Sequence, residues 1–77
     1  MRTIVFNGVT VEYDEKLVHS WKWQKKLAMN NGVAGMLAVE DLLLGKDEEV
    51  ADAIGDDVET MGKLVAAIMD ENGKAKN

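Results

Sequence analysis

Residues 3–13 read TIVFNGVTVEY and determine the fold at the N-terminal end of the chain. Two runs rich in β-branched and aromatic residues flank Asn7-Gly8, and apolar and polar residues alternate in the second run. Both central residues of a type I′ turn need a positive φ, which Asn and Gly tolerate best. The pattern therefore predicts a β-hairpin with one apolar face. An isolated hairpin is marginal in water, so we expect that face to lie on helices.

The residues that follow the hairpin predict a helix from about Glu15 to Met29. Asp14 can cap its first turn, and Asn30-Asn31-Gly32 would end it. The two tryptophans on this helix, Trp21 and Trp23, are separated by about 200° around the axis.

They therefore cannot both point into one small core. Trp21 shares a face with Leu17, so we expect Trp21 to point inward. Trp23 would then lie outward, either packed on lysine stems or as an anchor for another protein.

Three further helical segments are expected. Residues 33–44 are expected to form an apolar, central helix that Gly45 ends. Asp47 then precedes a short helix over residues 48–54, which Gly55 ends. The last helix has the clearest pattern: Asp56 and Glu59 have capping-box spacing, and apolar residues recur at helical intervals from 58 to 69. Asn72-Gly73 would end this helix.

The composition is that of a small globular protein. The 77 residues are 47% hydrophobic, and they include no cysteine and no proline. We therefore predict an α+β fold, with an N-terminal β-hairpin followed by a bundle of three to four helices. Residues 1–73 would form a single small domain and residues 74–77 a disordered tail. The lack of cysteine excludes a disulfide framework and a thiolate metal site.

Charge is unevenly distributed along the chain, whose net charge is −5. Residues 1–39 hold five bases and three acids (+2), and residues 40–77 hold four lysines and eleven acids (−7). The two halves can be solvated faces, can stack head to tail, or can present an acidic face to a basic partner. The net negative charge argues against general nucleic-acid binding. No apolar run approaches the ~20 residues of a membrane span, so we expect a cytoplasmic protein without membrane contact.

The sequence shows little sign of catalysis or of a cofactor. His19 is the single histidine, and no nucleophile is evidently paired with it. The acidic run from Asp47 to Glu59 does not match a calcium-binding loop, because position 5 is Ala51, and we interpret these acids as solvated helix starts. No phosphate-binding glycine motif is present. We therefore expect no enzyme activity, no metal and no cofactor.

Apolar residues in excess of a small core favour contact with other polypeptides. The residues that we expect to contact a partner are Trp23, Leu27, Met36, Met61 and Met69, although methionines at helical spacing are also ordinary core residues. Self-association of the chain is a further expectation from the same surplus.

Residues 39–77 carry a family resemblance. They read VEDLLLG, then a charged segment, then IGDDVETMGKLVAAIMD, and close with GKAKN. With the N-terminal strand pair and the Trp-bearing first helix, this pattern covers most of the chain and resembles the tail assembly chaperones of long-tailed phages and prophages, which are short, acidic and mainly helical. The resemblance implies a protein of the host cytoplasm that binds the tape measure protein and tail tube subunits during assembly. It also implies a longer form made by frameshifting near Lys74 to Asn77.

Two other functions are compatible with the sequence. The first is a small acidic regulatory or inhibitor protein that acts by protein–protein contact. The second is a DNA-binding module that uses the lysines between residues 16 and 26, although arginine, which makes the commonest specific base contact, is lacking there.

Overall fold

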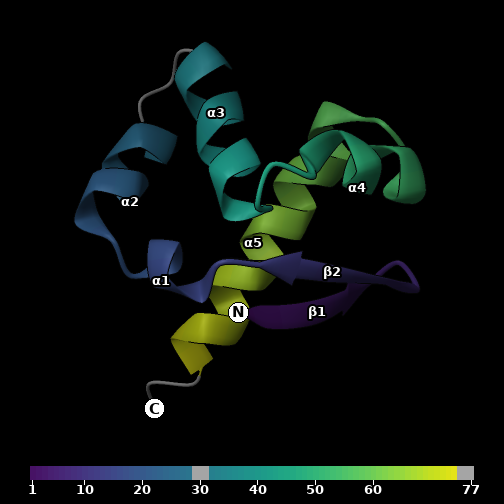
Figure 1. The fold of residues 1–77 in the computed structure, drawn as a ribbon, viewed down its shortest axis with the longest axis horizontal. Helices are drawn as coiled ribbons and strands as arrows, with labels where there is room; N and C mark the ends of the chain where they lie inside the picture. The colour runs from purple at the N-terminus through teal and green to yellow at the C-terminus, as the bar shows by residue number, and fades with distance from the viewer. Residues whose placement is uncertain (29–31, 75–77) are drawn as a thin grey trace.

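The computed structural model describes residues 1–28 and 32–74, and it has the predicted α+β architecture (Figure 1). The elements are β1 (Arg2–Phe6), β2 (Val9–Tyr13), α1 (Glu15–Val18), α2 (Trp21–Ala28), α3 (Gly32–Leu42), α4 (Asp47–Ile54) and α5 (Val58–Lys74). The two strands form one antiparallel sheet that crosses the long helix α5. Helices α2 and α3 lie side by side at one end of this sheet, and α4 lies at the other.

The hairpin is confirmed. Asn7 (φ 50°) and Gly8 (φ 78°) form its turn, with the positive φ values that the dipeptide was expected to adopt. The register pairs Phe6 with Val9 and Arg2 with Tyr13 at the open end. Because side chains alternate across the sheet, one face is buried against the helices while the other remains exposed.

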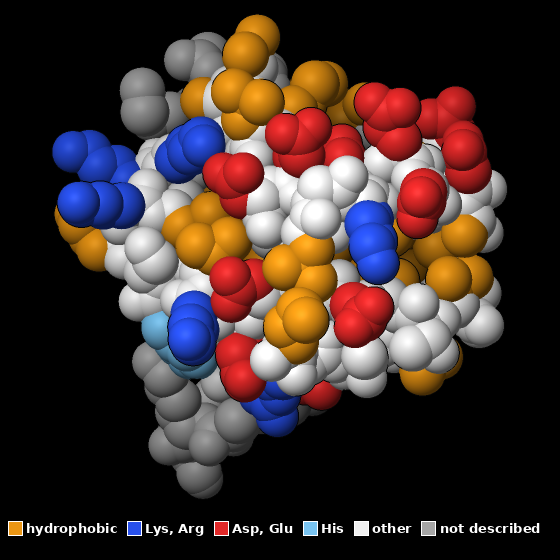
Figure 2. Space-filling model, viewed as in Figure 1, with side chains coloured by type: hydrophobic (Ala, Val, Ile, Leu, Met, Phe, Trp, Pro, Cys, Tyr) orange, Lys and Arg blue, Asp and Glu red, His pale blue; other side chains and the backbone are white. Residues whose placement is uncertain are grey.

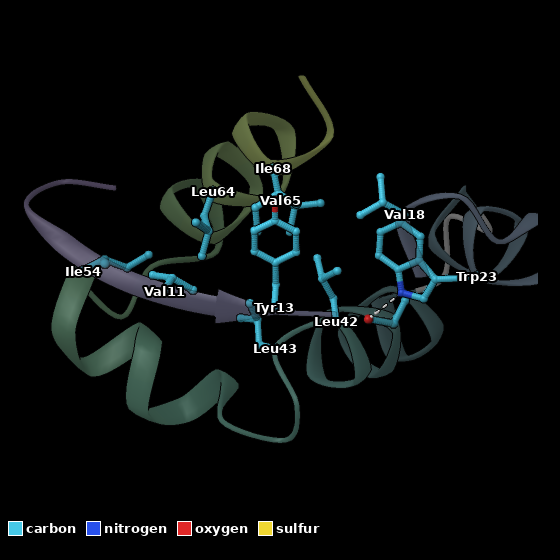
Figure 3. Packing of buried hydrophobic residues seen from close by; sticks show 11 residues of the cluster. Val11, Tyr13, Val18, Trp23, Leu42, Leu43, Ile54, Leu64, Val65 and Ile68 are labelled. Carbon is cyan, nitrogen blue, oxygen red and sulfur yellow. Dashed lines mark hydrogen bonds between the residues drawn. The ribbon is translucent and has the colours of Figure 1, made fainter. Parts of the chain in front are cut away.

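The core lies between β2, α3 and α5. Figure 3 shows the Tyr13 ring between side chains of α5 and Leu42 of α3, all of them buried. Leu64 and Ile68 of α5 are separated by one helical turn and are completely buried. The amphipathic pattern of the last helix thus covers the apolar face of the hairpin.

The first predicted helix is two helices. Asp14 caps α1 as expected, because its Oδ1 accepts a hydrogen bond from the Lys16 backbone N at 3.0 Å. The chain then leaves the helix at His19, and the Ser20 Oγ accepts a bond from the Trp23 backbone N at 3.2 Å, which caps α2. The predicted end at Met29 lies outside the described residues. Gly32, expected to stop this helix, is instead the first residue of α3.

The predicted orientation of the two tryptophans is wrong. Trp23 is 3% exposed and its indole Nε1 donates a hydrogen bond to the Ala38 carbonyl oxygen at 2.8 Å (Figure 3). Trp21, in contrast, is 77% exposed. The break after Val18 explains the difference. It resets the helical phase, so a face shared with Leu17 no longer determines which indole points inward.

The C-terminal helix continues past its predicted end. Asn72 is buried; its Nδ2 donates to the Ile68 carbonyl oxygen at 2.8 Å and to the Tyr13 hydroxyl at 2.9 Å, and its Oδ1 accepts from Arg2 at 3.1 Å. These contacts hold the last turn on the hairpin. Lys74 is therefore helical rather than part of a disordered tail, and residues 75–77 lie outside the described residues.

The remaining helix ends differ from the predictions by a few residues. Helix α3 ends at Leu42, because the turn that follows places Leu44 and Gly45 at positive φ. Asp57, rather than Asp56, caps α5: its Oδ2 accepts from the backbone N and the Oγ1 of Thr60, at 3.0 and 2.9 Å. The short helix α4 starts within one residue of its predicted position.

Candidate functional site

The described surface contains an apolar groove of about 660 Å³. Helices α3, α4 and α5 form most of it, and the end of α2 contributes one side chain. Its apolar side chains are Leu27, Met36, Val39, Ala51, Val58 and Met61. We refer to these six residues as the groove floor.

Helical spacing brings the floor residues together. Met36 and Val39 are three residues apart on α3, and Val58 and Met61 have the same spacing on α5, so each pair shares one helix face. Met36 is 62% exposed and Val58 is 76% exposed. Val39 and Met61 are partly covered and pack against the core. Val39 and Met61 therefore hold the groove floor against the core, whereas Met36 and Val58 are open to solvent.

Two of the groove-lining residues are glycines, which place no side chain in the groove. Gly35 on α3 and Gly62 on α5 both line it. A Cβ atom built on either residue would meet no other atom within 4 Å, and neither residue has a positive φ. Glycine within a helix is about 1 kcal/mol less favourable than alanine. Neither backbone conformation nor close packing in the described structure requires these glycines.

Four carboxylates also line the groove. Asp47 and Glu48 stand in the first turn of α4, and Asp56 and Asp57 lie in the connection from α4 to α5. We refer to these four residues as the acidic rim. Of the described residues that line the groove, none is Lys or Arg.

The charge asymmetry predicted from the sequence is visible on the surface. Figure 2 shows acidic side chains gathered at the upper right, over α4 and the start of α5, and basic side chains at the left, over α2. The exposed Trp21 lies on α2 beside two exposed lysines, Lys22 and Lys25. The other cation in this region, Lys26, pairs with Asp41 of α3 at 3.0 Å.

The structure places three of the five predicted contact residues in one groove. Leu27, Met36 and Met61 all belong to the floor. Trp23 does not, because it is buried in the core, and Met69 packs against the core elsewhere on α5. A role for the three floor residues in binding stays a prediction.

Sequence reasoning did not connect Val58 or the acidic rim with the predicted contact residues. Val58 was counted with the apolar face of the last helix, yet it lies at the first helical position, beyond the covered part of that face. The acids of the rim were interpreted as solvated helix starts. These acids lie close in sequence to exposed apolar residues. Only the folded structure shows that the two kinds of residue form one site.

The described residues contain no group of three or more His, Cys, Asp or Glu side chains placed to hold a metal ion. The single histidine, His19, is exposed at the end of α1. Within the same described part of the chain, no helix has both the length and the apolar character of a membrane span.

Models of known protein families, curated protein sequences and solved structures were compared with this chain, and none matches it. The fold is thus known from the structure alone. Its function has to be inferred from the groove together with the sequence pattern of the C-terminal half.

Proposed function

We propose that this protein is a tail assembly chaperone of a long-tailed phage or prophage. It would hold apolar helical segments of the tape measure protein in the groove between α3, α4 and α5, and would also contact tail tube subunits, in the host cytoplasm. The observation that carries the proposal is the groove itself, which gathers Leu27, Met36 and Met61 on an open apolar floor. The resemblance of residues 39–77 to this family supplies the identity of the partners.

The size of the groove suits a helix. A cavity of about 150 Å³ accepts one benzene-sized group, so a groove of about 660 Å³ can accept roughly four such side chains. An amphipathic helix presents about four apolar side chains over two turns, at positions i, i+3, i+4 and i+7. Binding of such a helix in an apolar groove is a common mode of recognition.

The exposure of the groove floor supports binding of another polypeptide rather than packing within this chain alone. Exposed apolar side chains such as Met36 and Val58 contribute little to the core of this chain. Gly35 and Gly62 lower helix propensity without a requirement from the fold. Both features are accounted for if another polypeptide fills the groove. Methionine suits this role because its flexible, polarisable side chain adapts to different partners.

The proposed mechanism is reversible covering of an aggregation-prone surface. A tape measure protein with bare apolar stripes would associate with itself, and a small partner can cover these stripes until the tail tube assembles. The negative charge of the chaperone then keeps the complex soluble. Neither step requires catalysis, so we propose that the protein is not an enzyme.

Co-expression with the tape measure protein encoded beside this chain tests the proposal. We expect the tape measure protein to be soluble with the wild-type chain and to precipitate with Met36→Asp, which places a charge on the floor. Val33→Asp is the matched control, since Val33 is a similarly exposed residue of α3 (72%) that does not line the groove. A tape measure protein that is equally soluble without this chain would contradict the proposed function.

The acidic surface favours a second candidate, a regulatory or inhibitor protein that binds a basic partner through contact alone. Residues 40–77 carry a net charge of −7, and the acids concentrate over α4 and the start of α5 (Figure 2). This candidate predicts binding that depends on surface carboxylates but not on the groove floor. Met36→Asp would then leave binding of the partner unchanged.

A further inference from the structure

We infer that the groove selects a basic amphipathic helix, one whose apolar stripe is flanked by Lys or Arg. The inference rests on the proposed function and specifies the chemistry of the segment that the chaperone would hold. It follows from the juxtaposition of the groove floor with the acidic rim.

The first step concerns which groups a bound helix must meet. A helix with side chains is about 10–12 Å wide, so when its apolar stripe rests on the floor, the residues beside the stripe face the edges of the groove. The groove lining beside the floor includes Asp47 and Glu48 in the first turn of α4, and Asp56 and Asp57 in the connection that precedes α5. Flanking residues of the bound helix therefore meet carboxylates.

The second step concerns charge complementarity. None of the described residues lining the groove is Lys or Arg, so nothing in the lining compensates the rim. The ion pairs of Lys26, Lys46 and Lys63 are made with Asp41, Glu12 and Glu59, acids that do not line the groove. An acidic flank on the partner would face like charges, which discriminates strongly against it, whereas a basic flank would gain favourable contacts.

The third step is that the rim acids differ in how free they are to recognise a partner. Asp57 already caps α5 through Thr60, so its carboxylate has a role in the fold. Glu48 and Asp56 are exposed. The structure thus points to Glu48 and Asp56 as the residues that determine the charge preference.

Two synthetic helical peptides test this inference. Both have about 20 residues, beyond the ~12–15 at which isolated helices are marginal, and share one leucine stripe. Lysine flanks the stripe in one peptide and glutamate in the other. We expect the full chain to bind the lysine-flanked peptide and to bind the glutamate-flanked peptide at least tenfold more weakly in a titration calorimeter. The difference should shrink between ~0.01 M and ~1 M salt, because the Debye length falls from about 30 Å to about 3 Å.

A pair of double variants provides a matched control. Glu48→Lys with Asp56→Asn alters the rim, whereas Glu49→Lys with Glu12→Gln makes the same change in net charge in the hollow between β2 and α4. One exposed ion pair changes affinity by about 1.4- to 5-fold. We therefore expect the rim variant to bind the lysine-flanked peptide roughly tenfold more weakly, and the control to change its affinity less than twofold.

Three results would overturn the inference. These are equal affinity for the two peptides at low salt, equal weakening by the two double variants, and binding of neither peptide. Sedimentation of the protein alone adds a fourth: self-association that the rim variant abolishes would show that a second copy occupies the groove.

The peptide experiment and the co-expression test can fail independently of each other. If the tape measure protein needs the chain for solubility but the peptides are bound equally, the charge preference is wrong and the chaperone role remains. If the lysine-flanked peptide is preferred but the tape measure protein does not need the chain, the preference stands and the partner is a different basic helix.

Discussion

The two ends of α5 have contrasting surroundings. Near its C-terminus, Asn72 is buried and uses its side chain to bond Tyr13, Arg2 and the backbone of α5. Near its N-terminus, Val58 is 76% exposed and faces an open groove. The closed end is specified by hydrogen bonds and packing that the chain supplies itself. The open end has apolar surface without a cover from the described residues, which is the property expected of a binding site.

The largest expected effect concerns the closed core. Replacing the buried Trp23 by alanine should destabilise the protein by about 3–5 kcal/mol, because it removes a packed indole and a hydrogen bond to Ala38. A chain of this size has little stability to spare, so we expect Trp23→Ala to be largely unfolded by circular dichroism. Trp21→Ala, at the exposed indole, should change stability by less than about 0.5 kcal/mol. Equal effects would contradict the assignment of the two indoles.

The next effect tests the hydrogen bonds of the closed end. Asn72→Ala should cost about 1–3 kcal/mol in urea denaturation, because it leaves the buried Tyr13 hydroxyl without its amide partner. The double variant with Tyr13→Phe should lose less than the sum of the single variants, since the two groups interact. Additive losses would show that the hydrogen bond between Asn72 and Tyr13 does not couple the two residues energetically.

Removing the N-terminal cap of α5 should change the stability of the protein by a smaller amount. Asp57→Ala should destabilise the protein by about 1 kcal/mol, because it removes the acceptor for the Thr60 N–H. Asp56→Ala leaves the cap bond between Asp57 and Thr60 in place, but Asp56 has a positive φ of 38°, which alanine tolerates less well. The cleaner control is therefore Asp56→Asn, which we expect to alter thermal denaturation little.

At the open end we expect a gain in stability. Gly62→Ala should stabilise the protein by about 1 kcal/mol, because alanine favours the helix and its Cβ meets no atom within 4 Å. The same change narrows the groove, so binding of the lysine-flanked peptide should weaken. Gly73→Ala is the control: Gly73 lies on α5 outside the groove, and its Cβ is equally unobstructed. A loss of stability at Gly62 would mean that the groove end is more tightly packed than the structure shows.

The smallest expected change in stability is at Met36, on the groove floor. Met36→Ala should leave the free energy of unfolding within about 0.5 kcal/mol of wild type, because the side chain is 62% exposed. It should nevertheless weaken peptide binding measurably, since it removes part of the floor. If Met36→Ala costs stability as a core residue would, the groove is part of the core and does not await a partner.

Prediction from sequence succeeded where local chemistry determines the structure. The Asn7-Gly8 turn needs positive φ at two successive residues, and α5 has an apolar repeat too regular for another element. It failed at the break between α1 and α2. There Ser20 offers a cap that competes with a continuous helix, and tertiary packing of Trp23 against α3 favours the break.

The candidate site was predictable only in part. Leu27, Met36 and Met61 were recognised as surplus apolar residues, but periodicity alone cannot separate floor residues from core residues such as Met69. The acidic rim was interpreted as ordinary helix starts because that is the usual role of acids in a first turn. Its position beside the floor depends on how α4 packs against α5.

By itself the sequence determined the elements whose causes are local: the hairpin, the amphipathic last helix and the uneven charge of the two halves. The tertiary structure decided which indole is buried, how far α5 extends and which apolar residues meet in the groove. The reason is that these features depend on contacts between residues far apart in the chain. Tyr13 and Asn72 are separated by 59 positions, and their hydrogen bond keeps helical a turn that Asn72-Gly73 would otherwise end.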